Sequence, residues 1–162
     1  MRDWRQRPVE VRNLLNPAFC GRVLYAAVAA FQKRCGRNLP FPLVYLVLPL
    51  VLPSRIRHSI SSRTHLLNWT QAHQDLIYDF GQRARDLVEV TNEAMELMLQ
   101  AGFLVLTDEG ELSKSHSNRS LGKARYADEE VKDCLTKAEH VGRWFAAAGK
   151  VETIYVCLGV RP

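Results

Sequence analysis

The dipeptide Gly149-Lys150 could end a phosphate-binding loop, in which a glycine-rich turn cradles phosphates and a lysine reaches them. Such a loop has a glycine five residues before its second glycine, a serine or threonine after the lysine, and a strand in front. Here Trp144 and Val151 occupy the first two positions, and a helical pattern precedes the dipeptide. We therefore expect no ATP hydrolysis by this chain alone.

The other polar groups are incomplete as catalytic or metal sites. The 5 histidines form no His-x-x-x-His pair and have no nearby cysteine ligand, which argues against a zinc site. The tripeptide Ser115-His116-Ser117 holds a nucleophile and a base, but adjacent residues rarely face each other productively and no acid lies close. The run Asp128-Glu129-Glu130 fits the first turn of a helix, where negative charge favours the helix dipole. We expect a protein that is not an enzyme and holds no cofactor.

The 4 cysteines lack Cys-x-x-Cys spacing and each lies in an apolar stretch. This pattern predicts buried thiols in a reducing compartment. No apolar run resembling a secretion signal follows the N-terminus, so we expect a cytoplasmic protein. The apolar run 39–53 is shorter than a membrane span and is interrupted by Pro40, Pro42 and Pro49, so it predicts a buried central helix without a membrane partner.

Charge is divided unevenly along this chain of 162 residues, which we expect to form a single domain. Residues 1–63 hold 11 Lys or Arg and 2 Asp or Glu, whereas the rest of the chain has more acids than bases. The asymmetry favours a basic face for an acidic partner and a separate acidic face for another. A solvated surface without a partner is the alternative.

The stretch from Thr91 to Ser115 predicts a helix followed directly by a hairpin. We expect Thr91 to cap a helix 91–101 that ends at Gly102. Strands 103–107 and 111–115 then join at a turn over residues 108–110, and we expect Phe103, Val105 and Leu112 to point into the core. The resulting prediction is a mostly helical α+β fold with a winged-helix-like core.

The remaining elements follow from capping signals and hydrophobic periodicity. Asn16 and Pro17 begin a helix that ends at Gly36, and Gly21 on it allows another backbone to approach closely. The other expected elements are a short basic helix or loop 54–62, two amphipathic helices within 64–90 with Asp75 capping the second, a helix 128–149 capped by Asp128, and a C-terminal strand 153–160.

Two stretches are strongly basic, the N-terminal arm 1–15 and the loop 113–125 that extends the wing. Phosphate contacts to a nucleic acid require Lys and Arg. The expected helix 91–101, however, carries Glu93 and Glu96 and no base, so it would enter a major groove poorly. The candidate nucleic-acid contacts are Arg55, Arg57, Arg63, Lys114, Arg119, Lys123 and Arg125.

Aromatic and arginine residues in two apolar motifs are candidate anchors for a protein partner, because these residue types dominate interface energetics. They are Phe19 in the first helix, and Arg143 with Trp144 and Phe145 in the helix 128–149. Packing in the core, with Arg143 paired internally, is the alternative for the same residues.

Several motifs resemble the middle component of bacterial three-component ABC-ATPase conflict systems, a group similar to the LmuC subunit of Lamassu defence systems. These motifs occur in the order expected for that family, and they extend over nearly the whole chain from Arg7. The motifs are RPVEVRNLLNPAFCG at 7–21, LPF at 39–41, LVLPLVL at 46–52, VGRWFAAAG at 141–149 and GVRP at 159–162.

The resemblance implies a non-enzymatic accessory subunit that bridges an SMC-like or Rad50-like ABC ATPase and an effector, often a nuclease, in defence against phage or plasmids. Accessory subunits of SMC complexes are commonly built from winged-helix domains, and DNA would be sensed through the complex. The alternative from the residues is a free-standing winged-helix regulator that binds DNA.

Overall fold

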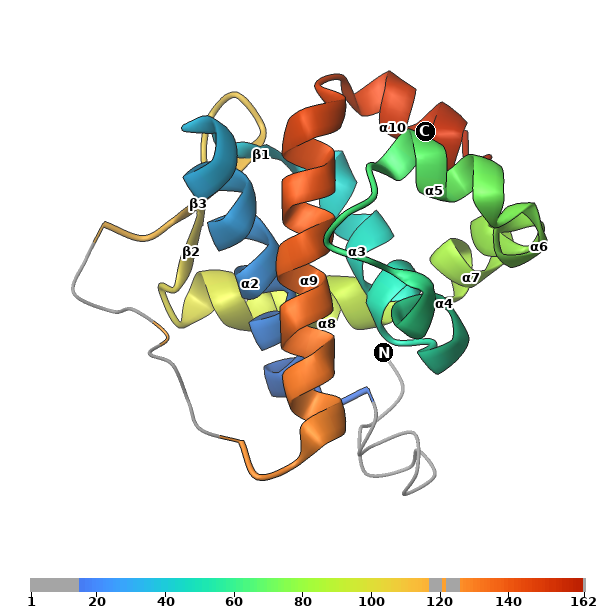
Figure 1. Cartoon of the computed structure of the whole chain (residues 1–162). Helices are drawn as coiled ribbons and strands as arrows, with labels where there is room; N and C mark the ends of the chain where they lie inside the picture. The colour runs from blue at the N-terminus through green and yellow to red at the C-terminus, as the bar shows by residue number, and fades with distance from the viewer. Residues whose placement is uncertain (1–14, 117–120, 122–125, 162) are drawn as a thin grey trace.

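The computed structural model describes residues 15–116, 121 and 126–161 (Figure 1). It is mostly helical with one small antiparallel sheet, which confirms the predicted α+β class. The elements in chain order are α2 (Pro17–Cys35), β1 (Leu39–Pro40), η2 (Phe41–Leu43), α3 (Val44–Val51), α4 (Ser54–Ser59), α5 (Leu66–Ala72), α6 (Gln74–Ile77), α7 (Phe80–Asp86), α8 (Val88–Gln100), β2 (Leu104–Leu106), β3 (Glu111–Lys114), α9 (Glu129–Ala148) and α10 (Val151–Cys157).

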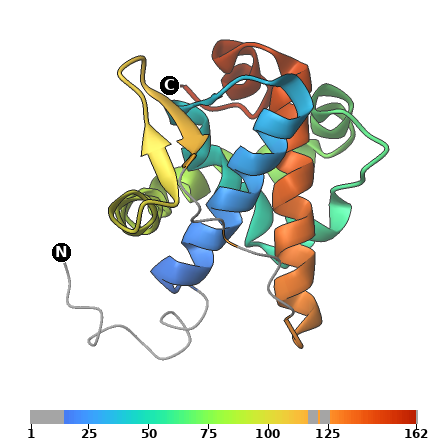
Figure 2. The same ribbon diagram turned by 90° about the vertical axis from the view of Figure 1, so that its left-hand side faces the viewer.

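Helix α2 lies at the centre of the fold and packs mainly against α9 and α8 (Figure 2). It begins as predicted, because the Asn16 side chain accepts a hydrogen bond from the Ala18 N–H at 2.8 Å and Pro17 occupies the first turn. It ends at Gly36 in the left-handed conformation, φ 70°. The predicted capping residues are thus confirmed, and they set the two ends of the helix around which most of the core packs.

The α2–α9 contact brings two backbones together at Gly142 of α9. A Cβ on Gly142 would lie 2.2 Å from the carbonyl oxygen of Ala27, so only glycine fits. At Gly21, by contrast, a Cβ would meet side-chain atoms of Met98 rather than another backbone. The prediction that a second backbone approaches Gly21 was therefore wrong. A close approach of two backbones occurs instead at Gly142 of α9.

The apolar run 39–53 forms the interior of the fold. Residues 44 and 46–51 of α3 are all buried, and Pro49 lies inside the helix without ending it. The predicted buried helix is confirmed. The first two residues of the apolar run, Leu39 and Pro40, form strand β1 instead of belonging to the helix. In the part of the chain that the structure describes, no helix is long and apolar enough to cross a membrane.

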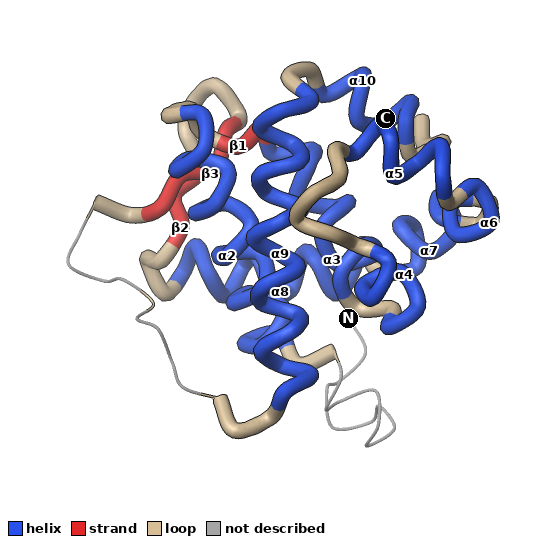
Figure 3. The backbone as a smooth tube through the Cα atoms, viewed as in Figure 1, coloured by secondary structure: helices blue, strands red, loops and turns tan. Residues whose placement is uncertain are grey.

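The three strands lie on one side of the helical body (Figure 3). Strand β3 lies between β1 and β2, with Leu39 opposite Leu112 and Leu104 opposite Lys114. The predicted hairpin after Gly102 is thus confirmed. Its inward residue on β2 is Leu104, whereas Val105 is 44% exposed, so the predicted inward position of Val105 was wrong.

Three other predictions were wrong in detail. Helix α8 begins at Val88, so Thr91 lies inside it and its hydroxyl donates to the Leu87 carbonyl rather than capping. The segment 64–90 holds α5, α6 and α7, and His73 rather than Asp75 is the N-cap of α6. The C-terminal run forms helix α10 instead of a strand, because Ile154, Tyr155 and Leu158 bury one helical face.

Helix α9 was predicted correctly at both ends. The Asp128 carboxylate accepts hydrogen bonds from the N–H groups of Glu130 and Val131, at 2.8 and 3.3 Å, and Gly149 follows the last turn.

The cysteines are all unpaired thiols, two of them buried. Burial raises the pKa of the Cys20 thiol to about 12.

Candidate functional site

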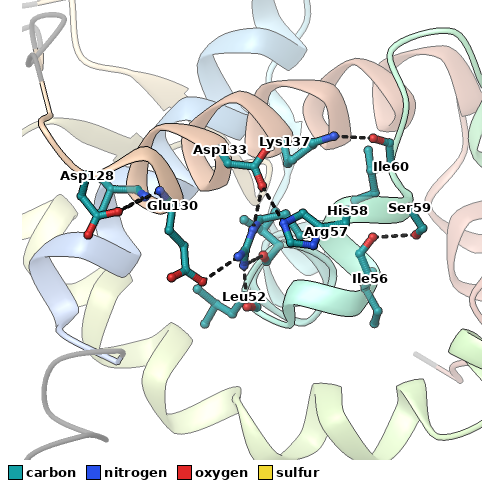
Figure 4. Close-up of polar contacts among 12 residues, drawn as sticks. Leu52, Ile56, Arg57, His58, Ser59, Ile60, Asp128, Glu130, Asp133 and Lys137 are labelled. Atoms are coloured by element: carbon teal, nitrogen blue, oxygen red, sulfur yellow. Dashed lines mark hydrogen bonds and ion pairs between the residues drawn. The ribbon is translucent and has the colours of Figure 1, made fainter.

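Arg57 of α4 is one of the candidate nucleic-acid contacts, but its side chain is buried and fully engaged inside the protein (Figure 4). Its Nε and Nη2 donate to Asp133 and Glu130 of α9 at 2.9 and 2.7 Å. Its Nη1 donates to the backbone carbonyls of Val51 and Leu52 at 3.1 and 2.8 Å. Arg57 therefore fastens α4 and the end of α3 to α9, and its side chain does not lie on the surface.

Trp144 and Phe145 are also buried, 4% and 0% exposed respectively. The Trp144 indole N–H donates to the Thr64 carbonyl at 2.6 Å, and its ring lies 5.4 Å from that of Trp69. Trp144 thus packs against Trp69 of α5, and Phe145 belongs to the buried core, as the core-packing alternative predicts. Neither is accessible to a protein partner in this structure.

Phe19 is half-buried at the edge of an apolar hollow of 410 Å³ between α2 and α8. Leu97, Met98 and Phe103 line the same hollow, and Tyr126 borders it. The Tyr126 ring also lies 5.3 Å below the guanidinium carbon of Arg22, so the hollow adjoins a basic surface. Phe19 therefore stays a candidate partner contact.

The other basic candidates are spread over the molecule. Arg55 is exposed on α4 and forms an ion pair with Asp75 at 2.8 Å, and Arg63 is exposed in the loop that follows. Lys114 ends β3, on the opposite side of α9 from α4 (Figures 1 and 2). Arg119, Lys123, Arg125 and the arm 1–14 lie outside the described residues. The candidates that the structure describes thus do not form one continuous nucleic-acid surface.

Lys114 and Arg143 do meet, in a groove of 1130 Å³ between α2, α9 and the end of β3. We call this the α2–α9 groove. Figure 2 shows α2 and α9 side by side with the hairpin next to them. The side chain of Gln32 ties the parts together, since its Oε1 accepts from the Lys114 N–H at 3.0 Å and its Nε2 donates to Asn38. Hydrogen bonds of Gln32 therefore join two walls of the groove, α2 and the end of β3, to each other.

The groove combines a small apolar floor with a basic rim. Ala26, Ala29 and Ala30 of α2 form much of the floor. The bases along the rim are Arg22, Lys33, Arg34, Lys114 and Arg143. Among the described residues that line the groove, Glu139 is the one acid, and it lies 3.8 Å from Arg143.

Sequence reasoning identified Lys114 and Arg143 but missed Arg22, Lys33 and Arg34. The missed signal was helical spacing on α2, where Arg22, Ala26, Ala29 and Lys33 recur on one face. That face is neither apolar enough to belong to the core nor fully exposed. A stripe of alanines bordered by bases on a central helix was therefore the available clue.

No group of three or more His, Cys, Asp or Glu residues that could hold a metal ion occurs within residues 15–116, 121 and 126–161. What the groove offers is positive charge beside apolar surface, which suits binding.

A family model of the middle component 3 of ABC-three component (ABC-3C) systems matches residues 4–162. The chain belongs to this family. The match spans every element described above, including both walls of the α2–α9 groove. No curated protein and no solved structure matched the chain.

His140 of this middle component gives its folded state a pH dependence. Burial, then the charges of Arg143 and Lys137, lower the pKa of the imidazole, and its Nδ1 is buried with no described hydrogen-bond partner. Between the lowered pKa and the ordinary value near 6.5, the unfolded chain binds the proton and the folded chain does not. The contribution of the neutral His140 side chain to the free energy of unfolding is therefore fully present above pH 6.5 and is lost as the solution becomes more acidic.

We predict that His140→Gln removes this component of acid sensitivity. In urea denaturation, the free energy of unfolding of the wild type relative to His140→Gln should fall between pH 7.5 and pH 5.5 (about one unit either side of an ordinary imidazole pKa). A difference that stays constant across this range would contradict the assignment.

Proposed function

We propose that this chain is a non-enzymatic accessory subunit that connects an ABC ATPase with an effector in a defence complex. The observation that carries the proposal is the family match over residues 4–162, because a middle component acts with the other components of its system. The α2–α9 groove and the apolar hollow at Phe19 supply surfaces for such contacts.

In the finer form of the proposal, the ATPase is SMC-like or Rad50-like and the effector is a nuclease, as in Lamassu systems. The subunit would dock on the ATPase head region in the cytoplasm and pass on DNA sensing to the effector. The order β1-β3-β2 and the helix that leads into the hairpin support a winged-helix core of the kind used by SMC accessory subunits.

The proposal predicts co-purification with the ATPase and effector encoded beside it. With the chain tagged and the three components co-expressed, we expect both partners to be recovered at physiological salt, before and after nuclease treatment. Retention after nuclease is expected because direct protein contacts hold the complex together. Recovery of neither component would overturn the proposal.

A free-standing winged-helix DNA regulator is the second candidate, and the sheet order and hairpin favour it. The helix that would enter the major groove is α8, and it carries Glu89, Glu93 and Glu96. These acids would face phosphates in a bound duplex. Salt-dependent binding of a DNA duplex by the isolated chain, with no recovery of protein components, would favour the regulator.

A further inference from the structure

The α2–α9 groove holds more positive charge than its own side chains neutralise. Lys33, Arg34 and Lys114 are exposed, and none of them forms an ion pair with any residue that the structure describes. Glu139 is 3.8 Å from Arg143, too far for a strong charged hydrogen bond. Like charges gathered in this way repel one another until an acidic group binds between them.

Helix capping accounts for only part of this cluster. Lys33 and Arg34 lie in the last turn of α2, where positive charge interacts favourably with the helix dipole. That explanation does not apply to Lys114, which is on a strand, or to Arg143, which lies more than one turn before the end of α9. Three separate elements thus direct bases toward one hollow.

The dimensions and floor of the groove favour a polypeptide. Its volume of 1130 Å³ exceeds the roughly 300–1,000 Å³ usual for small-molecule sites, and it is open on one side. The small side chains of Ala26 and Ala29 allow another backbone to lie close to α2, as in helix packing. Tyr25 and Leu135 add half-buried apolar surface at the sides.

A nucleic acid would use this groove less well. A duplex presents phosphates to the bases of a protein, and the apolar floor beneath them would gain nothing from that contact. An amphipathic helix, in contrast, places apolar residues on the floor and acidic residues against the rim. The combination of floor and rim therefore matches a protein segment better than a phosphate backbone.

We propose that the α2–α9 groove binds an acidic amphipathic helix from another component of the same ABC-three component system. This inference rests on the proposed function, since it names the contact through which the accessory subunit is held. The partner helix inserts a narrow apolar stripe over Ala26 and Ala29. Its Asp and Glu side chains pair with Lys33, Lys114 and Arg143.

The test uses the full chain and measures its affinity for the purified ATPase and, separately, for the purified effector. The triple variant Lys33→Glu, Arg34→Glu, Lys114→Glu reverses the rim. The matched control Arg85→Glu, Lys150→Glu, Arg161→Glu makes the same change of charge at exposed positions outside the groove. We expect at least a 10-fold loss of affinity for one component from the groove variant and less than 2-fold from the control.

A second pair of variants tests the floor without changing charge. Ala29→Trp fills the groove, whereas Ala72→Trp adds the same side chain at the exposed end of α5. We expect Ala29→Trp alone to weaken binding, with both variants keeping the wild-type circular dichroism spectrum. A photo-crosslinking residue at position 29 should then label a helical segment rich in Asp and Glu.

Two results would overturn the inference while leaving the proposed function intact. One is full affinity of both groove variants for the ATPase and the effector. The other is a groove variant that keeps those affinities but loses binding to a 20-base-pair DNA duplex (about two turns of B-DNA, 10–10.5 base pairs each). Failure of the wild-type chain to bind either component would instead overturn the proposed function, and the inference with it.

Discussion

Gly142→Ala should destabilise the protein by at least about 3 kcal/mol, at the upper end of the range for overpacked cores. A Cβ at this position would lie 2.2 Å from the Ala27 carbonyl oxygen and 3.1 Å from the Phe31 nitrogen. These are backbone atoms, so α2 and α9 would have to move apart. Thermal unfolding followed by circular dichroism should show a drop in Tm of roughly 6–12 °C for a chain of this size.

Gly81→Ala provides the matched control, because Gly81 lies in helix α7 and a Cβ there meets nothing closer than 3.9 Å. Alanine is the better helix former, so this variant should be stabilised by about 0.5–1 kcal/mol. Gly21→Ala should fall between the two, since the flexible Met98 side chain can move aside. Equal stability of Gly142→Ala and Gly81→Ala would contradict the close contact between α2 and α9.

Arg57→Met should cost about 3 kcal/mol of stability, because it removes the donor to the buried Val51 carbonyl and the part-buried Leu52 carbonyl, and both ion pairs to α9. The side chain of Glu130 is 64% exposed and that of Asp133 is 30% exposed, so both carboxylates can be rehydrated. The loss therefore comes mainly from the carbonyls of Val51 and Leu52. Urea denaturation at pH 7 measures it.

The same network predicts an asymmetry between its members. Glu130→Gln removes a mostly exposed partner and should cost less than about 1 kcal/mol. Arg57→Lys keeps the positive charge but cannot reproduce the fork of donors, so its loss should be intermediate. If Glu130→Gln were as damaging as Arg57→Met, the carbonyl contacts would not be the main source of stability.

The sequence predicted those elements that are specified by local chemistry. Asn16 with Pro17, Asp128, and the glycines after α2 and α8 each act within a few residues, so their patterns could be recognised without a structure. The β-rich composition of 153–160 was misleading because tertiary contacts override propensity there. In the helix that forms, the Tyr155 hydroxyl donates to the distant Pro42 carbonyl at 2.7 Å.

The candidate site was less accessible to sequence reasoning. The sequence predicts Arg57 to be a surface base, because its acidic partners lie on α9, far along the chain. Trp144 and Phe145 have the residue types of an interface, and only the fold shows them facing inward. The groove brings together α2, β3 and α9, and no pattern within any one of these segments indicates that they meet.

The contact between Ala27 and Gly142 also has a consequence during protein synthesis. Helix α2 is synthesised before α9, and the described elements from β1 to β3 are made between the two. Contacts of such long sequence separation slow folding and leave apolar surface uncovered in the meantime. The α2–α9 groove therefore cannot form until α9 has left the ribosome, and a nascent chain that stops before α9 has no groove.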